Sequence, residues 1–196
     1  MSSPVKIANQ ALIRLGVKKI VAFTDEKKAA DVMSTNYDNS RDTLLKLYPF
    51  KFAKKRQTLA PLSTTPKWGF EFEYELPSDY IRLLDVEGHS AAVDIDGRSN
   101  NYKLEGRTIR TNQATSINIL YICNSSPEAF FDPDFVKVFF LQLALDGFTT
   151  LAGRGTSRSK IEGEFLAAIE VAKRNGSLEE PNEQAYSAEW ENSRNG

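Results

Sequence analysis

Cysteine and histidine are almost absent from this chain of 196 residues, which holds one of each, Cys123 and His89. A single cysteine excludes an internal disulfide framework. A single histidine excludes a metal site with two histidine ligands, and any triad that uses histidine must be built around position 89. We therefore expect no metal and no other cofactor. The low cysteine content is typical of a protein made in a reducing compartment.

Long apolar runs and net charge are missing as well. No stretch approaches the ~20 consecutive apolar residues of a membrane span, and the first residues lack the basic start and apolar run of a signal peptide. Lysine and arginine (25) nearly balance aspartate and glutamate (26), so the net charge is −1. This balance argues against a protein that coats nucleic acid over its whole surface, although local patches remain open. We expect no membrane partner and a single domain.

Four segments have the periodicity of helices. The longest lies within residues 26–48, and Ser40 is the one polar member of its buried stripe. The apolar members of that stripe are Ala30, Met33, Tyr37, Leu44 and Leu47. We expect Thr24 or Asp25 to cap this helix and Pro49 to end it, because the residue before a proline avoids the α region. The other predicted helices cover residues 3–16, 132–152 and 159–175.

Two of these helices carry terminal signals, and one is unusual in composition. Ser3 with Pro4, and Asp132 with Pro133, are typical helix starts, and a capping box is predicted at Ser159. The helix after Asp132 is apolar on every side, so it must be buried all round. A bundle of so few helices supplies little cover, and we expect a neighbouring subunit to provide part of it.

The middle of the chain has the pattern of antiparallel strands. Residues 51–60 predict a basic strand, and residues 68–76 alternate between apolar and glutamate-rich faces. The apolar face of that alternation comprises Trp68, Phe70, Phe72, Tyr74 and Leu76. Further strands are predicted at 80–86, 102–104, 108–110 and 117–123, with hairpin turns at 96–97 and 106–107.

The predicted fold class is therefore α+β. About four helices form a bundle, and an antiparallel β-rich portion is inserted between the second and third helices. The helical portion comprises residues 1–50 and 127–175, and the β portion comprises residues 51–126. Residues 176–196 are predicted to be an acidic tail, in which Tyr186 and Trp190 are candidate contacts for docking onto a neighbour.

Basic residues gather after the long helix, at Lys51, Lys54, Lys55 and Arg56. Interleaved with aromatic residues, they are candidates for a nucleic-acid surface. A strand edge that is solvated or faces a partner explains them at least as well. Six acidic residues follow in the next strands and offer complementary charge within the chain or between subunits: Glu71, Glu73, Glu75, Asp79, Asp85 and Glu87.

A second basic segment, GRGTSRSK at residues 153–160, resembles a phosphate-binding loop in composition alone. Its lysine does not follow a glycine, and a helix rather than a strand precedes it. We interpret it as a turn between two helices with solvated arginines. Arg154 and Arg158 are candidates for contact with a partner's carboxylates or with DNA phosphate.

Enzyme chemistry has no positive signal in the sequence. His89 beside Gly88 is typical of a solvated turn, and Cys123 lies on an apolar strand face with no base spaced to activate it. Residues 94–97 (DIDG) lack the further oxygen ligands of a calcium loop and are better explained by a hairpin turn. A pair of carboxylates for glycan hydrolysis remains open, because their separation in space decides it. We predict a protein that is not an enzyme.

Four features occur in a characteristic order along the chain. A first helix ends in RLG (residues 14–16), and a long helix carrying Tyr37, Asp38 and Arg41 runs into LYPFKFAKKRQTLA (residues 47–60). An aromatic strand then leads into LPSDYIRLLDV (residues 76–86). An apolar helix, a glycine-bearing turn and a helix with KIEGEF (residues 160–165) follow.

Together these features, over residues 5–175, resemble the tail tubular protein A family of short-tailed bacteriophages. The resemblance implies a head-to-tail adaptor whose fold is a helical portion with an appended β-rich portion. It implies a homo-oligomeric ring, a dodecamer, that joins the portal protein above to a tail nozzle (tail tubular protein B-like) below. Double-stranded DNA would pass through the channel. The implied location is the head–tail junction of the virion, after synthesis in the host cytoplasm. Some relatives carry large insertions, and this compact chain is not expected to have those side domains.

Overall fold

The computed structural model describes residues 3–87 and 102–178, and these form four α-helices and two three-stranded antiparallel sheets. The helices are α1 (Pro4–Arg14), α2 (Lys28–Leu47), α3 (Pro133–Leu151) and α4 (Arg158–Leu178). The strands are β1 (Lys54–Leu59), β2 (Phe72–Glu75), β3 (Tyr80–Val86), β4 (Tyr102–Glu105), β5 (Thr108–Thr111) and β6 (Ile117–Cys123). The predicted α+β class is confirmed, with the β portion between α2 and α3.

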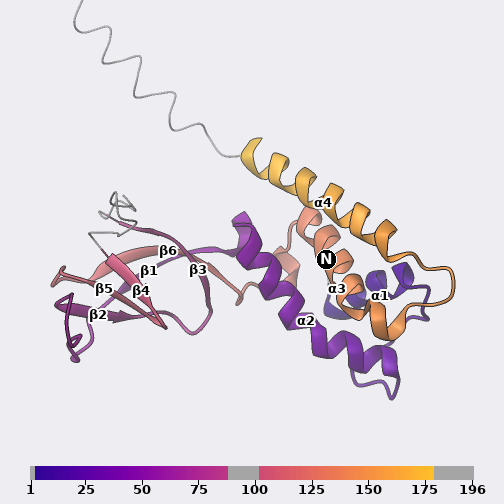
Figure 1. Ribbon diagram of the computed structural model, residues 1–196, viewed down its shortest axis with the longest axis horizontal. Helices are drawn as coiled ribbons and strands as arrows, with labels where there is room; N and C mark the ends of the chain where they lie inside the picture. The colour runs from indigo at the N-terminus through magenta and orange to yellow at the C-terminus, as the bar shows by residue number, and fades with distance from the viewer. Residues whose placement is uncertain (1–2, 88–101, 179–196) are drawn as a thin grey trace, which may run out of the picture.

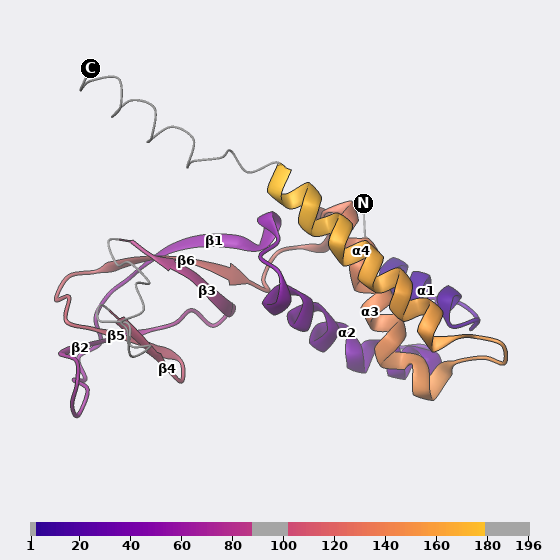
Figure 2. The ribbon, with the colours of Figure 1, turned by 45° about the horizontal axis from the view of Figure 1, so that its top comes forward.

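The molecule is elongated, with the helix bundle at one end and the sheets at the other (Figure 1). One sheet has the strand order β1-β6-β3 and the other β2-β5-β4. Figure 2 shows the two sheets facing each other as two layers. The chain crosses between the two portions twice, from α2 into β1 and from β6 into α3.

Each portion has its own core, and β6 contributes to both because its side chains alternate between its two faces. On one face, Ile117, Ile119, Tyr121 and Cys123 pack between the sheets. On the other face, Ile122 is fully buried against the helix bundle. The apolar strand face predicted around Cys123, and the burial of that cysteine, are confirmed.

The all-apolar helix α3 is buried within its own chain. It packs against α1, α2 and α4, and both Phe135 and Phe139 are fully buried. The other helices of the same chain therefore supply more of its cover than the sequence predicted, although Val136, Leu145 and Phe148 are only partly buried. They do so because α3 lies at the centre of the bundle with the other three around it (Figures 1 and 2).

Several predicted helix ends are confirmed. Ser3 caps α1 by accepting a hydrogen bond from the Lys6 backbone N–H (3.3 Å), and Asp132 caps α3 by accepting one from the Asp134 N–H (2.8 Å). Ser40 is buried, and its hydroxyl donates to Asp146 of α3. The helix α2 ends at Leu47, two residues before Pro49, as predicted.

Other predicted helix boundaries are wrong. Neither Thr24 nor Asp25 caps α2, because the Asp25 carboxylate instead accepts hydrogen bonds from the Val21 and Ala22 N–H groups and closes the preceding turn. Leu47 is 55% exposed rather than part of the buried stripe. At the last helix, the Ser157 hydroxyl, not Ser159, accepts from a first-turn N–H.

The end of α4 and two strands also differ from prediction. The helix α4 continues to Leu178, so residues 176–178 belong to it rather than to the tail. Residues 51–53 form a 3₁₀ turn, and the strand β1 starts only at Lys54. The strand β2 is confined to Phe72–Glu75, which leaves Trp68 in the preceding loop with 81% of its surface exposed. The hairpin turn at 106–107 is confirmed, with Gly106 at φ +60°, whereas the turn at 96–97 lies outside the described residues.

Candidate interaction surfaces at the helix–sheet junction

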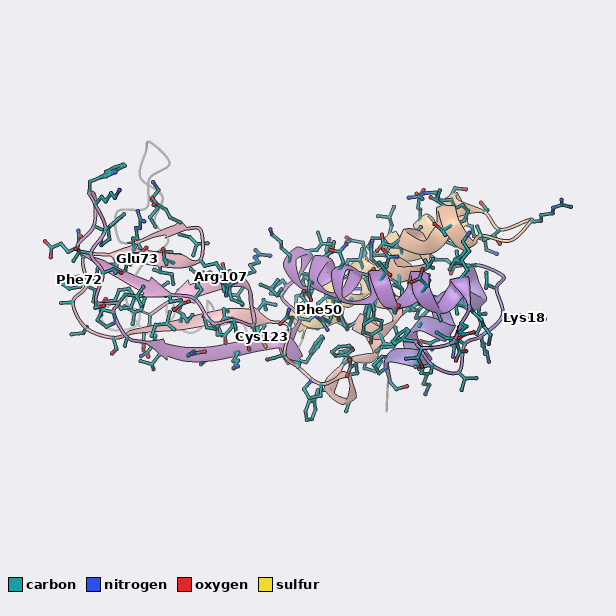
Figure 3. All side chains as sticks on the ribbon, turned by 90° about the horizontal axis from the view of Figure 1, so that it is seen from below. Lys18, Phe50, Phe72, Glu73, Arg107 and Cys123 are labelled. Carbon is teal, nitrogen blue, oxygen red and sulfur yellow. The ribbon has the colours of Figure 1, made fainter. Side chains whose placement is uncertain are left out.

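Aromatic side chains hold the basic segment at the junction of the two portions. The backbone of Tyr48 is extended after α2, and the Tyr48 ring packs edge-on against Phe50 at a centroid distance of 5.0 Å. Phe50 and Phe52 each lie 4.8 Å from the ring of Phe135 on α3. Figure 3 shows Phe50 between the bundle and the sheets. The segment that carries the lysines is therefore packed against an aromatic cluster on α3.

The strand β1 distributes its basic residues over two faces of the sheet. In its register with β6, Lys55 lies opposite Tyr121, whereas Arg56 lies opposite Leu120. Neighbouring residues of a strand point to opposite faces, so Lys55 faces the second sheet and Lys54 and Arg56 face away from it. The predicted basic cluster is therefore not one continuous surface.

Lys55 belongs to a polar cluster around Asp79, in the turn from β2 to β3. Its Nζ lies 2.8 Å from Asp79 Oδ2, and the Ser125 hydroxyl donates to the same oxygen at 2.7 Å. The Tyr121 hydroxyl lies 3.0 Å from Asp79 Oδ1 and 3.1 Å from Gln57 Oε1. One of the predicted pairings between the basic strand and the acidic residues thus forms within a single chain.

The pKa values of this cluster follow from its contacts. Burial raises the pKa of Asp79, but the hydrogen bonds from Lys55, Ser125 and Tyr121 lower it by more, so the net change is downward. Burial, followed by the hydrogen bond to the Asp79 carboxylate, raises the pKa of Tyr121 to about 12. The hydrogen bond to Asp79 raises the pKa of Lys55. Each group is therefore stabilised in its ordinary protonation state at neutral pH, which suits a structural cluster and not an acid–base catalyst.

The outer face of the β1-β6-β3 sheet carries charges of both signs. Arg56 from β1 and Asp85 from β3 both lie opposite Leu120 of β6. Together with Glu87 they line a shallow hollow of about 280 Å³. Asn118 donates to Glu87 at 2.5 Å. Acidic groups beside Arg56 oppose the binding of phosphate at this face.

A larger groove, which we call the junction groove, lies between the start of β1, the start of α3 and the end of α4, with a volume of about 750 Å³. Its lining includes Tyr48, Phe50, Phe52, Phe130 and Leu178, together with Lys51, Lys54, Asp132 and Asp134. Two of the apolar residues are strongly exposed, Phe130 at 69% and Leu178 at 78%. The groove thus has an aromatic floor, an apolar rim, two lysines beside β1 and two aspartates at the start of α3.

Glycine at position 176 shapes one side of this groove. A Cβ atom at that position would overlap the Tyr48 hydroxyl and lie 3.3 Å from Tyr48 Cζ. The same hydroxyl lies 3.4 Å from the carbonyl oxygen of Lys173. The end of α4 therefore approaches the junction closely because residue 176 has no side chain.

The second basic segment lies at the opposite end of the bundle, in the turn between α3 and α4 (Figure 1). Arg158 Nε lies 2.7 Å from Glu162 Oε1, and its guanidinium carbon lies 5.8 Å from the Phe148 ring centroid. Arg154 is exposed in the turn. These two arginines are far from residues 51–56, and Arg158 contacts both Glu162 of its own helix and Phe148 of α3.

The remaining predicted residues divide between the second sheet and the undescribed parts of the chain. Glu73 accepts a hydrogen bond from the Thr108 hydroxyl (2.8 Å) and pairs with Arg110 (3.4 Å) inside the β2-β5-β4 sheet. Tyr186, Trp190 and His89 lie outside the described residues. Within residues 3–87 and 102–178, no group of three or more metal-ligating side chains occurs, and no helix is long and apolar enough to cross a membrane.

Sequence reasoning missed the junction groove and most of the Asp79 cluster. The groove joins segments around residues 50, 132 and 176, and no local pattern signals their proximity. The cluster depends on the register between β1 and β6, which places Lys55 and Tyr121 opposite each other. No protein-family model matches the chain, and a search of curated proteins finds no match.

Proposed function

We propose that this protein is a structural virion protein, the head-to-tail adaptor of a short-tailed bacteriophage, and that it assembles into a ring between the portal and the tail nozzle. The observation that supports this most is the insertion of a complete β portion between α2 and α3 of a helix bundle. This is the arrangement implied by the resemblance to the tail tubular protein A family, which includes the motifs at residues 47–60 and 76–86.

The distribution of exposed apolar side chains also suits a ring subunit. Trp68 is exposed at the β end of the molecule, whereas Ile13 and Val21 are exposed on the bundle at 54% and 84%. Large exposed side chains on different parts of one chain suit head-to-tail contacts, in which one patch meets a different patch on the next copy. Such contacts close into a ring when the rotation between copies fits.

Acidic neighbours of the basic strand suit a channel through which DNA moves. Lys55 pairs with Asp79, and Asp85 and Glu87 lie beside Arg56, which weakens the attraction of these two cations for phosphate at neutral pH. A channel that bound duplex DNA tightly would slow its passage, since affinity grows with the number of neutralised phosphates. Portal protein, nozzle protein and passing double-stranded DNA are the proposed partners, and no catalytic step is proposed.

Electron microscopy of the purified protein mixed with the portal protein from the same phage tests this proposal. We expect a ring of twelve copies on one face of the portal. A Trp68→Ser variant should keep the fold, because the side chain is exposed, and should form fewer rings. The matched control is Leu47→Ser, another exposed apolar residue but on α2. Failure of the unmodified protein to bind the portal in both microscopy and sedimentation would contradict the proposal.

A further inference from the structure

The junction groove has the features of a binding site for an extended segment with aromatic and acidic side chains. Its floor is aromatic, and the exposed Phe130 and Leu178 on its rim are apolar side chains left open to water. Its volume of about 750 Å³ lies in the range of sites that hold small ligands and peptide side chains. We infer that this groove binds residues 183–191 of the same chain's C-terminal tail.

Charge complementarity favours this occupant. Lys51 and Lys54 line the groove beside the start of β1, whereas its two aspartates, Asp132 and Asp134, lie at the start of α3 and accept hydrogen bonds from the Asp134 N–H and the Asn175 side chain. The segment 183–191 has the sequence EQAYSAEWE, with three glutamates and no basic residue. Tyr186 and Trp190 offer large rings to the aromatic floor, and such rings contribute most of the binding energy in many interfaces.

The tail begins beside the groove and is long enough to reach it. Leu178, the last described residue, lines the groove itself. Tyr186 follows eight residues later, and eight extended residues span at most about 26–29 Å. Pro181 lies between them and disfavours continuation of the α4 helix, which allows the chain to turn back.

The same chain is a better occupant than a second copy because the tail is tethered. The short connection to Leu178 keeps this segment at an effective concentration of about millimolar, far above the usual concentration of a second copy in solution. Even a weak contact therefore forms within the chain. This inference does not depend on the proposed adaptor function, because it concerns the isolated protein.

Trp190 can report on the groove once the other tryptophan is removed. In a Trp68→Phe variant of the full chain, Trp190 is the one remaining tryptophan, and Trp68 itself is 81% exposed, so its replacement should leave the fold unchanged. We expect blue-shifted Trp190 emission and an acrylamide quenching constant several-fold below that of free tryptophan. Adding Lys51→Glu and Lys54→Glu should raise the quenching constant of Trp190 to that of free tryptophan.

Two further variants separate loss of the site from loss of the fold. Lys18→Glu with Lys19→Glu makes the same change of charge at two exposed positions. Figure 3 shows Lys18 at the far end of the bundle, so Trp190 should remain protected in this variant. Phe130→Ser changes an exposed rim residue and should also release Trp190. Thermal unfolding followed by circular dichroism checks that each variant is folded.

Charge reversal in the tail provides the decisive test of the contact between the tail and the groove. Glu189→Lys with Glu191→Lys should expose Trp190 in the parent chain and protect it again beside Lys51→Glu and Lys54→Glu. Equal quenching in all variants would overturn the inference. Protection that appears only as protein concentration rises, together with dimers in sedimentation, would overturn the same-chain assignment and identify a second copy as the occupant.

Discussion

The Tyr121 hydroxyl lies 3.0 Å from Asp79 Oδ1, and this contact joins the central strand β6 to the turn that connects the two sheets. The other carboxylate oxygen of Asp79 lies 2.8 Å from Lys55 Nζ on the edge strand β1. One carboxylate therefore ties together three separate segments of the β portion. Its side chain is only 15% exposed, so these hydrogen bonds are partly shielded from water.

An Asp79→Asn substitution should destabilise the protein by about 2 kcal/mol, because hydrogen bonds to a charged group are worth about 1.5–3 kcal/mol and Lys55 loses its counter-charge. The matched control is Asp38→Asn, which removes an ion pair with Arg41 at a side chain that is 77% exposed. That change should stay within about 0.5 kcal/mol. Urea unfolding measures both, and equal effects would show that the Asp79 cluster has no special role.

At low pH, the difference in unfolding free energy between the wild type and Asp79→Asn should disappear. The pKa of Asp79 is lowered in the folded state from an ordinary value of 3.8. A lowered folded pKa gives stability that is present above the unfolded pKa and is lost as the pH falls through the folded pKa. The gap in unfolding free energy should therefore be constant from about pH 7 to 5 and shrink below about pH 4. If the difference in unfolding free energy stays constant down to pH 2, the loss of stability comes from altered packing at residue 79 and not from the loss of its charge.

Element type was predictable here wherever a local pattern decides it, and contacts between distant segments were not. The period of α2, the caps at Ser3 and Asp132, and the strands at 80–86 and 117–123 follow from neighbouring residues. Trp68 fits the alternation of its segment, yet β2 begins only at Phe72, because β5 pairs with four residues alone. Pairing length is a tertiary property that alternation cannot specify.

The candidate surfaces illustrate the same limit. The sequence shows four basic residues within residues 51–56 but not that Lys55 and Arg56 face opposite sides of an edge strand with different acidic neighbours. It shows an apolar α3 but not that three other helices surround it. Both depend on where non-neighbouring segments meet, and only the folded chain specifies that.

Gly147 lies where α3 packs against Met33 of α2 and against Leu15. A Cβ atom there would lie 2.8 Å from Met33 Cε and 3.6 Å from Leu15 Cδ1. The Met33 methyl is the far end of a flexible side chain and can move aside, so overpacking in Gly147→Ala should cost only about 1 kcal/mol, which the better helix propensity of alanine largely offsets. Gly163→Ala in α4 is the control, since no atom lies within 4 Å of its Cβ position. That change should be neutral or stabilise by up to about 1 kcal/mol in thermal unfolding.

The Tyr37 hydroxyl is buried without a hydrogen-bond partner in the described part of the chain. Its ring packs against Phe23 and Phe139 at centroid distances of 5.5 and 4.9 Å. Tyr37→Phe keeps both ring contacts and removes the unsatisfied group, so it should stabilise the protein by about 1 kcal/mol. Tyr74→Phe should instead destabilise the protein, because the Tyr74 hydroxyl donates to backbone carbonyls, including that of Thr115 at 2.8 Å. Loss of stability in both variants would contradict this reading of Tyr37.

The basic strand should give little affinity for duplex DNA. Lys55 is held by Asp79, and Arg56 shares its face with Asp85 and Glu87. We expect the wild type to bind a 30-base-pair duplex with a Kd weaker than about 100 µM at physiological salt, the weak limit of non-specific binding. The informative variant is Lys54→Glu with Arg56→Glu, which leaves the Asp79 cluster intact, and Lys18→Glu with Lys19→Glu is its charge-matched control. Micromolar binding that is salt-dependent, lost in the first variant and kept in the second would favour a nucleic-acid-binding module over the adaptor, because a channel protein gains nothing from holding the DNA that must pass it.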